Sequence, residues 1–273
     1  ITSKSLPPPD TSIIILSNLI PTHPSIDIIN QTYNSLFEML VGLPLNTPIY
    51  ISVDGLPTSK QTPKNIERLH DYVENLRSRF LKNSPHAVTI LNNYQHGHIS
   101  NSIGAALELI STPFVYVIQH DLYFVKPVNH TGLIYAMQKY PEELQIVRFG
   151  KDKQRKDRVK RFDYCRDRMG YSITISKKLY FAPAGVWSDN NHLTTKAYYT
   201  RLLKNLGKAG RAPEFIMQRL AEKEYHNVSQ CYYRFQFLYN WQNGPFLGHS
   251  NGRETKNITQ LQKTNATTTI KKQ

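Results

Sequence analysis

Short apolar segments alternate with amphipathic segments along the first half of the chain. The apolar segments are predicted strands over residues 13–16, 48–53, 87–91 and 114–118, and the last of them is a continuous apolar run typical of a strand buried on both faces. Between them, apolar residues recur at helical spacing over residues 26–40, 66–80 and 103–110. This alternation predicts an α/β fold with a mostly parallel, doubly wound sheet flanked by helices.

The second half of the chain has a less regular pattern. The elements that it predicts are a helix around residues 133–139, strands over 145–149 and 173–181, a polar loop at 187–192, and a helix beyond that loop with Tyr198, Leu202 and Leu203 inward. A helix is also predicted over residues 214–224, whereas residues 232–241 are aromatic-rich and residues 245–253 have a loop-like composition. We expect one domain over residues 11–253, between an extended lead-in, residues 1–10, and a mobile tail, residues 254–273.

The strand predicted over residues 114–118 ends abruptly in three polar residues, Gln119, His120 and Asp121. Ligands in open α/β sheets bind at the carboxyl ends of the strands. An amide, an imidazole and a carboxylate at such an end therefore make a candidate site. The alternative is a buried strand that simply ends in polar loop residues.

The chain is strongly basic, with a formal net charge of +14 and a pI of about 9.6. Its lysines and arginines cluster in residues 151–168. A basic surface attracts nucleotides, nucleic acids and acidic membranes alike, so the charge does not choose among them. No glycine-rich Rossmann fingerprint or P-loop follows a predicted strand, so a nucleotide would have to be held differently.

Cysteine content and hydropathy bear on the compartment. Cys165 and Cys231 do not make a disulfide framework, which favours a reducing environment. No apolar run is long enough to span a membrane, and no signal-peptide pattern is present. We therefore expect a soluble, cytoplasmic protein.

Four features give residues 11–253 a resemblance to GT-A fold glycosyltransferases of the family 2 type. Asp54 ends a predicted strand where that fold places an acidic residue against the nucleotide base, and residues 98–121 look like the helix and strand that lead to the DxD motif. Glu214, in Ala-Pro-Glu-Phe-Ile-Met-Gln-Arg-Leu, resembles the acidic motif behind the acceptor. His249, in Gly-His-Ser-Asn-Gly-Arg, resembles the C-terminal histidine that some members place on metal or diphosphate.

Some details narrow the resemblance and others depart from it. The Trp-Ser-Asp-Asn-x-His and His-x-x-Gly-Arg segments look like transferases of algae and large algal DNA viruses, the chlorovirus type. The DxD position reads Gln119-His120-Asp121, so an amide replaces the first carboxylate. Glu-Asp is usual at the later motif, where this chain has Glu214-Phe215.

The resemblance implies transfer of a sugar from a nucleotide-sugar donor, preferably a UDP-sugar, to a hydroxyl of a glycan acceptor, with inversion. It divides the domain into a nucleotide-binding half, about residues 11–125, and an acceptor half, about residues 126–253. The implied donor-binding residues are Asp54, His98, Asn101, Gln119, His120 and Asp121.

The resemblance also implies a divalent cation, Mn²⁺ or Mg²⁺, on Asp121 and His249. Hard cations prefer oxygen ligands, so Asp121 is the first choice. Because Gln119 replaces a carboxylate, we expect a metal requirement that is not strict. A loop histidine that caps a turn is the alternative for His249, and Asp54 would equally suit the turn at Gly55.

Inverting transfer needs one general base, and Glu214 and Asp189 are the candidates. Glu214 is preferred because it occupies the family position. The structural alternatives are a first-turn acidic residue for Glu214 and a helix N-cap for Asp189. Trp187 and His192 would line the acceptor sugar, although Trp187 would equally suit the core.

Two other classes of function remain open from the sequence. The basic stretch suits a nucleic-acid-binding module, but no RNA-recognition, KH or helix-turn-helix pattern is visible, and we expect no specific nucleic-acid partner. The altered DxD position suits a catalytically inactive GT-A protein that only binds carbohydrate. An active enzyme would hydrolyse the donor in the absence of acceptor, whereas the inactive carbohydrate-binding protein would not. A steep salt dependence of oligonucleotide binding would favour the nucleic-acid-binding module.

Overall fold

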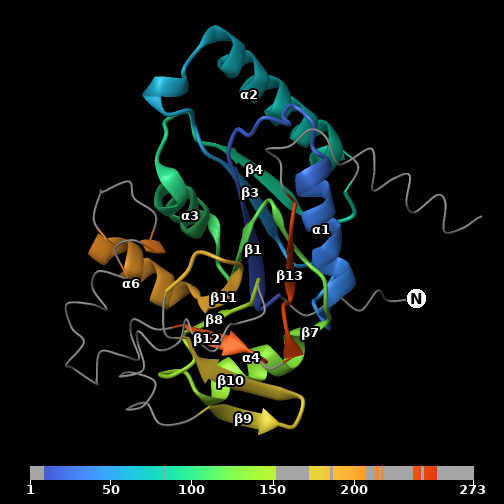
Figure 1. Ribbon diagram of the computed structural model, residues 1–273, viewed down its shortest axis with the longest axis vertical. Helices are drawn as coiled ribbons and strands as arrows, with labels where there is room; N and C mark the ends of the chain where they lie inside the picture. The colour runs from blue at the N-terminus through green and yellow to red at the C-terminus, as the bar shows by residue number, and fades with distance from the viewer. Residues whose placement is uncertain are drawn as a thin grey trace, which may run out of the picture.

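The computed structural model describes residues 9–82, 84–151, 172–184, 187–206, 213–214, 217, 236–240 and 243–250. Within these residues, nine strands form one sheet in the order β4-β3-β1-β5-β11-β8-β12-β10-β9 (Figure 1). The strands are β1 (Thr11–Ser17), β3 (Ile49–Val53), β4 (Val88–Asn92), β5 (Phe114–Gln119), β8 (Ile146–Arg148), β9 (Ile173–Ser176), β10 (Leu179–Pro183), β11 (His192–Thr195) and β12 (Phe237–Tyr239). All except β10 and β11 run in the same direction, which confirms the predicted α/β fold with a mostly parallel sheet.

The order of the strands reverses at β1. Strand β3 and then β4 add on one side of β1, whereas β5 pairs with its other side. All four strands are parallel, and Ile15 of β1 lies between Ile51 of β3 and Ile118 of β5. Such a switch point leaves a crevice outside the carboxyl ends of the strands. The residues that follow β1 and β5 therefore face a position suited to a ligand.

Three predictions for the second half are wrong in detail. Residues 173–181 form the hairpin β9–β10, with its turn at Lys177 and Lys178, instead of one strand. His192 begins β11, which pairs antiparallel with β5 and β8, instead of ending a loop. Strand β13 (Leu247–His249) lies within the segment expected to be loop. These strands have five residues or fewer, and β11 and β13 depend on partners distant in sequence, so their local pattern is weak.

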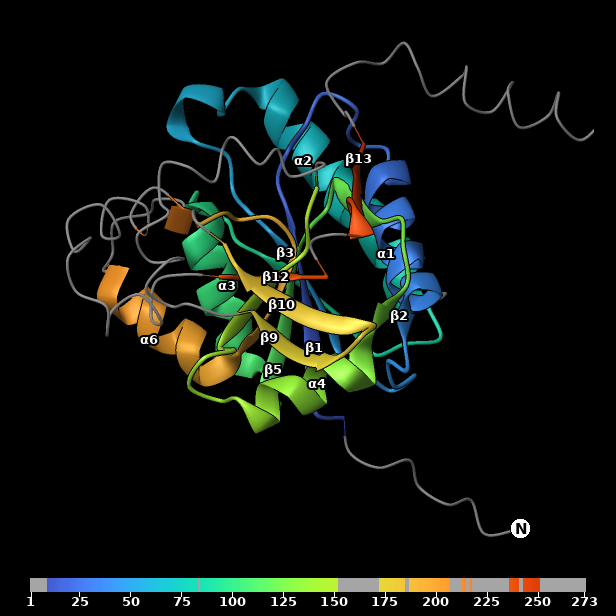
Figure 2. The same cartoon turned by 60° about the horizontal axis from the view of Figure 1, so that its bottom comes forward.

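Helices cover both faces of the sheet (Figures 1 and 2). They are α1 (Asp27–Met39), α2 (Pro63–Leu76), its extension η2 (Arg77–Leu81), α3 (His98–Leu109), α4 (His130–Lys139) and α6 (Lys196–Leu206), with a short turn η1 (Thr58–Lys60) before α2. Figure 1 shows α1 and α2 on one side of the sheet and α3 and α6 on the other. This arrangement leaves the carboxyl ends of β1 and β5 open between the two layers.

Side-chain alternation along β1 divides the core into two parts. Ile13 and Ile15 pack with buried residues of α1, α2 and α4, whereas Ile14 and Leu16 pack with those of α3 and α6. Side chains of successive strand residues point to opposite faces, so a strand covered on both faces must be apolar throughout. The unbroken apolar run in the sequence follows from this double burial.

Two small sheets lie beside the main one in the described part of the chain. Strand β13 pairs antiparallel with β6 (Leu122–Phe124), and β2 (Leu40–Val41) pairs parallel with β7 (Val128–Asn129). The first pair matters for function, because it places His249 opposite Leu122, next to Asp121.

Some predicted features lie outside the described residues. They are the basic stretch beyond Lys151, most of the helix expected over residues 214–224, both cysteines and the tail over residues 254–273. In the part of the chain that is described, no helix combines the length and apolar character needed to cross a membrane.

Candidate functional site

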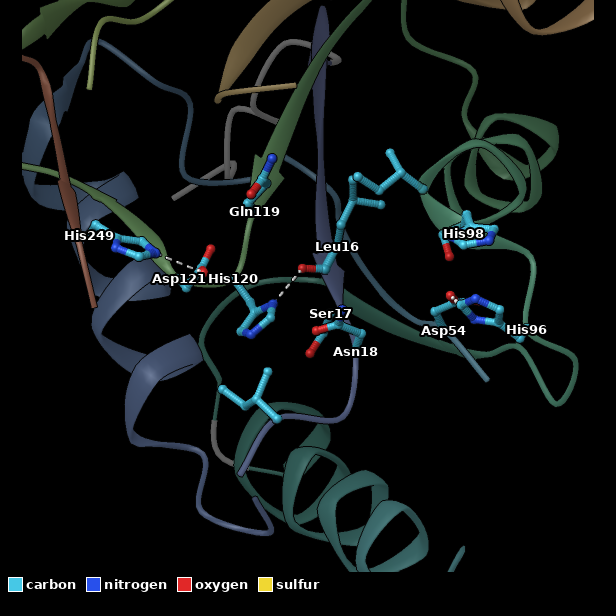
Figure 3. A pocket seen from close by; sticks show the side chains of 13 residues that line it. Leu16, Ser17, Asn18, Asp54, His96, His98, Gln119, His120, Asp121 and His249 are labelled. Carbon is cyan, nitrogen blue, oxygen red and sulfur yellow. Dashed lines mark hydrogen bonds and ion pairs between the residues drawn. The ribbon is translucent and has the colours of Figure 1, made fainter. Parts of the chain in front are cut away.

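A cavity of about 650 Å³ lies at the carboxyl ends of β1, β3 and β5, where the switch point predicts a ligand (Figure 3). This volume is typical of small-molecule sites. The lining consists of Leu16, Ser17, Asn18, Ile20, Asp54, His96, His98, Ile99, Ser102, Gln119, His120, Asp121 and His249. Three strand ends, the start of α3 and the end of β13 thus supply polar groups to one cavity.

Asp54 holds the loop before α3 in place on one wall of the cavity. Its carboxylate accepts a hydrogen bond from the backbone N–H of Gly97 at 2.9 Å and lies 2.7 Å from Nδ1 of His96. Nδ1 of His96 is also 3.0 Å from the carbonyl oxygen of Gly55. Both neighbours only accept, so Nδ1 of His96 must carry a proton. Asp54 therefore acts first as an anchor for this loop.

Gly55 allows the close approach of this loop. A Cβ atom at position 55 would lie 2.7 Å from backbone atoms of Asn93, Tyr94 and Gln95. Backbone atoms cannot move aside as the end of a flexible side chain can. Glycine at this position is therefore a steric requirement of the cavity wall, beyond the Asp-Gly turn that the sequence suggests.

Two histidines stand at the start of α3. The rings of His96 and His98 have centroids 4.1 Å apart, and His98 has a positive φ of 57°. A positive φ is uncommon for histidine and marks local backbone strain, which is frequent at functional sites. Asn101 is exposed, does not line the cavity, and has its side chain against Gly97.

Asp121 and His249 form a pair on the opposite wall (Figure 3). Oδ2 of Asp121 lies 3.2 Å from Nε2 of His249. The N–H of Ser250 donates to the carbonyl oxygen of Asp121 at 2.9 Å, which extends the β13–β6 pairing past the pair. The pair is thus positioned by backbone contacts between segments far apart in the chain.

This pair has the donor set for a divalent cation. The Asp121 and His249 side chains are 29% and 40% exposed, so both can be reached from the cavity. Among the described residues, no group of three or more His, Cys, Asp or Glu could hold a metal ion. Mg²⁺ is commonly bound by one or two carboxylates and completes its shell with water and substrate phosphates, and Asp121 supplies one such carboxylate. The residues therefore fit a cation that is held jointly with a phosphorylated ligand.

His120 is neutral and fixed in one orientation. Its Nδ1 lies 3.1 Å from the carbonyl oxygen of Leu16, to which it must donate. Burial is the largest effect on its pKa and lowers it below the ordinary value, against the opposing charge of Asp121. Nε2 is then an acceptor, and it has no hydrogen-bond partner among the described residues.

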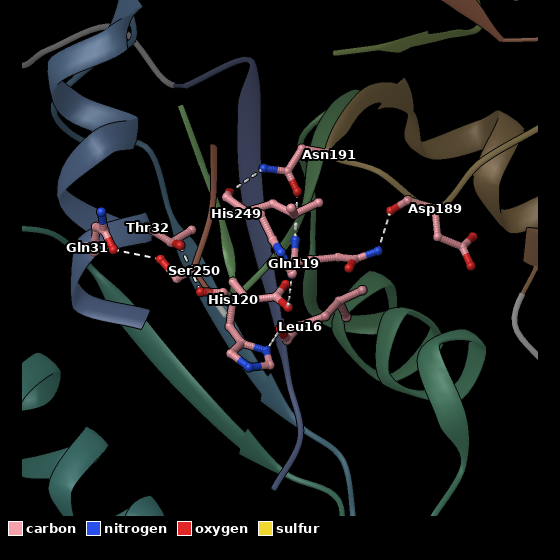
Figure 4. A network of polar contacts seen from close by, with 11 residues as sticks. Leu16, Gln31, Thr32, Gln119, His120, Asp189, Asn191, His249 and Ser250 are labelled. Atoms are coloured by element: carbon pink, nitrogen blue, oxygen red, sulfur yellow. Dashed lines mark hydrogen bonds and ion pairs between the residues drawn. The ribbon is translucent and has the colours of Figure 1, made fainter. Parts of the chain in front are cut away.

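Gln119 links the cavity to the loop that carries Asp189 (Figure 4). Its Nε2 donates to the carbonyl oxygen of Asp189 at 2.8 Å, and its backbone N–H donates to Oδ1 of Asn191 at 2.9 Å. Nδ2 of Asn191 donates in turn to the carbonyl oxygen of Leu122 at 2.7 Å. One buried asparagine thereby holds both ends of the turn that contains His120 and Asp121.

The two candidate bases lie side by side. The pKa of Asp189 is raised to about 7, first by burial and second by the negative charge of Glu214, while a hydrogen bond with the backbone of Glu214 opposes the shift. Burial also lowers the pKa of Arg148 to about 10, and Glu214 partly offsets that effect. Asp189, Glu214 and Arg148 therefore form one interacting group. It lies behind Gln119, and none of the three lines the cavity.

Trp187 and His192 are placed in the core instead of on the cavity wall. Trp187 is 1% exposed and packs in the cluster between the sheet, α3 and α6. His192 is 1% exposed and stacks on Tyr199 with ring centroids 5.5 Å apart. Burial lowers the pKa of His192 to about 4, and the charge of Arg148 adds to this effect. The core alternative for Trp187 fits these observations better than contact with an acceptor.

The structure brings together six of the residues predicted for the site. They are Asp54, His98, Gln119, His120, Asp121 and His249. Sequence reasoning did not single out Arg148 or Asn191. A charged residue inside a predicted buried strand is a signal for Arg148, because a buried charge needs a partner. The contacts of Asn191 join residues about 70 positions away, so its local sequence gives no comparable signal.

Comparison with known proteins gives similarity of fold only. The chain matches no protein-family model and no curated protein. Similar solved structures include S. aureus TarS 1–349, with 11% identity and a TM-score of 0.44 over 88% of this chain and 60% of that one. CMP:2-keto-3-deoxy-manno-octonic acid synthetase complexed with CTP has 10% identity and a TM-score of 0.44, over 96% and 99% of the two chains.

A third similar structure is the mannosyltransferase PcManGT from Pyrobaculum calidifontis, in complex with GDP-Man and Mn²⁺. It has 12% identity and a TM-score of 0.38, over 74% of this chain and 50% of that one. This chain thus spans 60% of TarS 1–349 and half of the mannosyltransferase. At these TM-scores the matches carry no functional assignment, and a proposal for this chain must rest on its own cavity.

Proposed function

We propose that this chain is a glycosyltransferase that moves a sugar from a nucleotide-sugar donor, preferably a UDP-sugar, to a hydroxyl of a glycan acceptor with inversion. The observation that carries the proposal is the cavity at the switch point, where the Asp121–His249 pair faces the Asp54–His96–His98 wall. This arrangement offers one polar wall to a nucleoside and a metal-binding pair to a diphosphate.

In this proposal the nucleoside lies against the loop anchored by Asp54. Both sides of the Asp54 carboxylate are already engaged, by Gly97 and by His96. Asp54 would therefore shape the nucleoside site, while His96 and His98 present their rings to the ligand. The start of α3 points its positive dipole end toward the same cavity, which favours an anionic ligand.

The diphosphate lies against Asp121 and His249. These two residues would hold Mn²⁺ or Mg²⁺, which when bound supplies positive charge where the leaving group develops negative charge. The high positive charge of the chain acts in the same direction at longer range.

The acceptor hydroxyl is deprotonated by a carboxylate of the Asp189–Glu214 pair. A general base works best when its pKa is near the operating pH. Because the pKa of Asp189 is raised to about 7, we assign Asp189 as the base and Glu214 as the charge that raises its pKa. This assignment reverses the order that the family position favours, and it depends on an acceptor that approaches past Gln119.

Thermal stabilisation by a panel of nucleotide sugars, followed by a transfer assay, tests the proposal. A ligand at 100 times its Kd stabilises the folded state by about 2.7 kcal/mol, which corresponds to a rise in Tm of roughly 5–10 °C for a domain of this size. UDP-sugars should give the largest rise, with a product of inverted anomeric configuration. Tighter calorimetric binding of GDP than of UDP would remove the uridine preference, and no stabilisation by any nucleotide sugar would contradict the proposal as a whole.

A further inference from the structure

Gln119 occupies the position where the resemblance expects a metal-binding carboxylate, and its contacts give it another role. Its Nε2 lies 2.8 Å from the carbonyl oxygen of Asp189. A carbonyl oxygen only accepts, so the amide nitrogen, and not the amide oxygen, must face it. A carboxylate at this position would bring a second acceptor against that carbonyl, with no proton between them.

The loop that Gln119 contacts is held on its other side by a second amide. Gln236 accepts from the N–H of Ser188 at 3.0 Å and donates to the carbonyl oxygen of Ser188 at 2.7 Å. Asn191 completes the attachment through the backbone N–H of Gln119. The segment that carries Asp189 is therefore fixed between β5 and the residue before β12 by three side-chain amides, and Gln119 is the one that also lines the cavity.

We propose that Gln119 is a positioning residue that couples the donor cavity to the Asp189 loop, and that this position requires an amide donor instead of a carboxylate. The inference rests on the function proposed above, because it gives Asp189 a role in transfer. It differs from the interpretation of Gln119 as a degraded metal ligand. On that interpretation a carboxylate would restore function, whereas the contacts of Gln119 indicate that a carboxylate would disturb it.

Three variants separate the two interpretations. Gln119→Glu keeps the side-chain shape, removes the donor and adds a charge near Asp189. Gln119→Met removes the donor without adding a charge. Gln145→Glu is the matched control, because the Nε2 of Gln145 also donates to a backbone carbonyl, that of Glu142 at 2.9 Å, but Gln145 does not line the cavity.

We expect both Gln119 variants to lower kcat by about 10²-fold, the effect of misplacing a reacting group by roughly 1 Å, with a smaller change in donor KM. Only Gln119→Glu should also move the pH midpoint of kcat upward, because its added negative charge disfavours ionisation of Asp189. Gln145→Glu should leave both quantities unchanged. A higher turnover or tighter Mn²⁺ binding in Gln119→Glu would overturn the inference.

Hydrogen exchange of the backbone amides of residues 188–191 provides a readout that does not need transfer. Exchange should be faster in both Gln119 variants and unchanged in Gln145→Glu. Unchanged exchange in the Gln119 variants would overturn the coupling, whatever their activity. If the unmodified protein transfers no sugar but exchange responds as expected, the proposed function fails while the coupling of Gln119 to the Asp189 loop stands.

Discussion

Oδ2 of Asp121 lies 3.2 Å from Nε2 of His249, although the two residues are 128 positions apart in the chain. The contact exists because β13 pairs with β6 and continues through the bond between Ser250 and the backbone of Asp121. A Cβ at Gly248 would lie 2.4 Å from the ring of Tyr123, so a larger residue there would require that ring to move. The diphosphate end of the proposed site is thus built from both halves of the chain.

Replacing Asp121 by asparagine should nearly abolish transfer and leave the fold intact. Asparagine keeps the size of the side chain but removes the negative charge that faces His249 and a cation. Loss of one group that stabilises the charge developing in the transition state typically lowers kcat by about 10²–10³-fold. The measurement is steady-state transfer together with circular dichroism and thermal unfolding.

Asp71→Asn is the control for this substitution. Asp71 is an exposed residue of α2, its side chain is 55% accessible, and it does not line the cavity. The Asp71→Asn variant should transfer sugar at the same rate as the unmodified protein. A folded Asp121→Asn variant that also kept this rate would remove Asp121 from the mechanism.

The first half of the fold could be predicted because double burial leaves a strong local signal. Strand β1 contains an unbroken apolar run from Ile13 to Leu16 and β5 one from Phe114 to Ile118, since helices cover both faces of these strands. The carboxyl ends of neighbouring parallel strands lie at the same edge of the sheet, so polar residues at those ends lie close together. Gln119, His120 and Asp121 could therefore be expected at such a strand end, whereas Asp54 is assigned through the resemblance to GT-A fold glycosyltransferases, and all four line the cavity.

The second half could not be predicted equally well, because its short strands depend on distant partners. Leu247–His249 has no alternation that distinguishes it from a loop, and it becomes a strand only where β6 is available. His192 reads as the end of a polar segment, yet β5 and β8 bury it from both sides. The attachment of the Asp189 loop consists of side-chain bonds to backbone groups, which leave no periodic pattern in the sequence.

Replacing Gly55 by alanine should weaken nucleotide binding by displacing the loop before α3. The added Cβ would meet three backbone atoms at 2.7 Å, so the loop must move away from Asp54 and carry Gly97 and His96 with it. Such overpacking typically destabilises a protein by about 1–3 kcal/mol. Urea unfolding and calorimetric titration with UDP measure the two effects.

Gly104→Ala provides the matched control in the adjacent helix. Outside its own helix backbone, a Cβ at Gly104 would meet the side chain of Leu203 at 3.8 Å, an ordinary contact. Alanine in a helix interior is favoured over glycine by roughly 0.5–1 kcal/mol, so this variant should be slightly more stable and bind UDP normally. Equal UDP affinity in the two variants would show that the Gly55 wall does not shape the nucleoside site.

Removal of divalent cations should reduce transfer without eliminating it. The Asp121–His249 pair offers a cation only one carboxylate, that of Asp121. Gln119 adds no second carboxylate, and its amide nitrogen donates to the backbone of Asp189. The basic surface of the chain then neutralises part of the diphosphate charge in chelator. The measurement is turnover in EDTA relative to turnover with added Mn²⁺ or Mg²⁺. Complete loss in EDTA, reversed only by one of these cations, would show that Asp121 and His249 suffice to make the metal essential.

Turnover should rise as the pH increases through about 7, because Asp189 must lose its proton to act as the base. Burial raises its pKa and the charge of Glu214 adds to the effect, so Glu214→Gln should shift the midpoint of the pH profile downward with a modest loss of kcat. Asp189→Asn should lower kcat by about 10²–10⁴-fold at every pH. The profile of kcat in both variants is the measurement, and a large loss in Glu214→Gln with an active Asp189→Asn would exchange the two roles.

The pH dependence of unfolding in Asp189→Asn tests whether burial raises the pKa of Asp189. A carboxyl whose pKa is higher in the folded state binds more protons there than in the unfolded state, where an aspartate has its ordinary pKa of 3.8. The contribution of Asp189 to the free energy of unfolding is therefore fully present below about pH 4 and is lost as the pH rises through about 7. At about 1.4 kcal/mol per pKa unit, this loss amounts to at most roughly 4 kcal/mol. Asp189→Asn should remove it, so the variant should be more stable than the unmodified protein at pH 8 and not at pH 4. Equal pH dependence of the unfolding free energy in the two proteins would show that Asp189 is not held in its protonated form by burial.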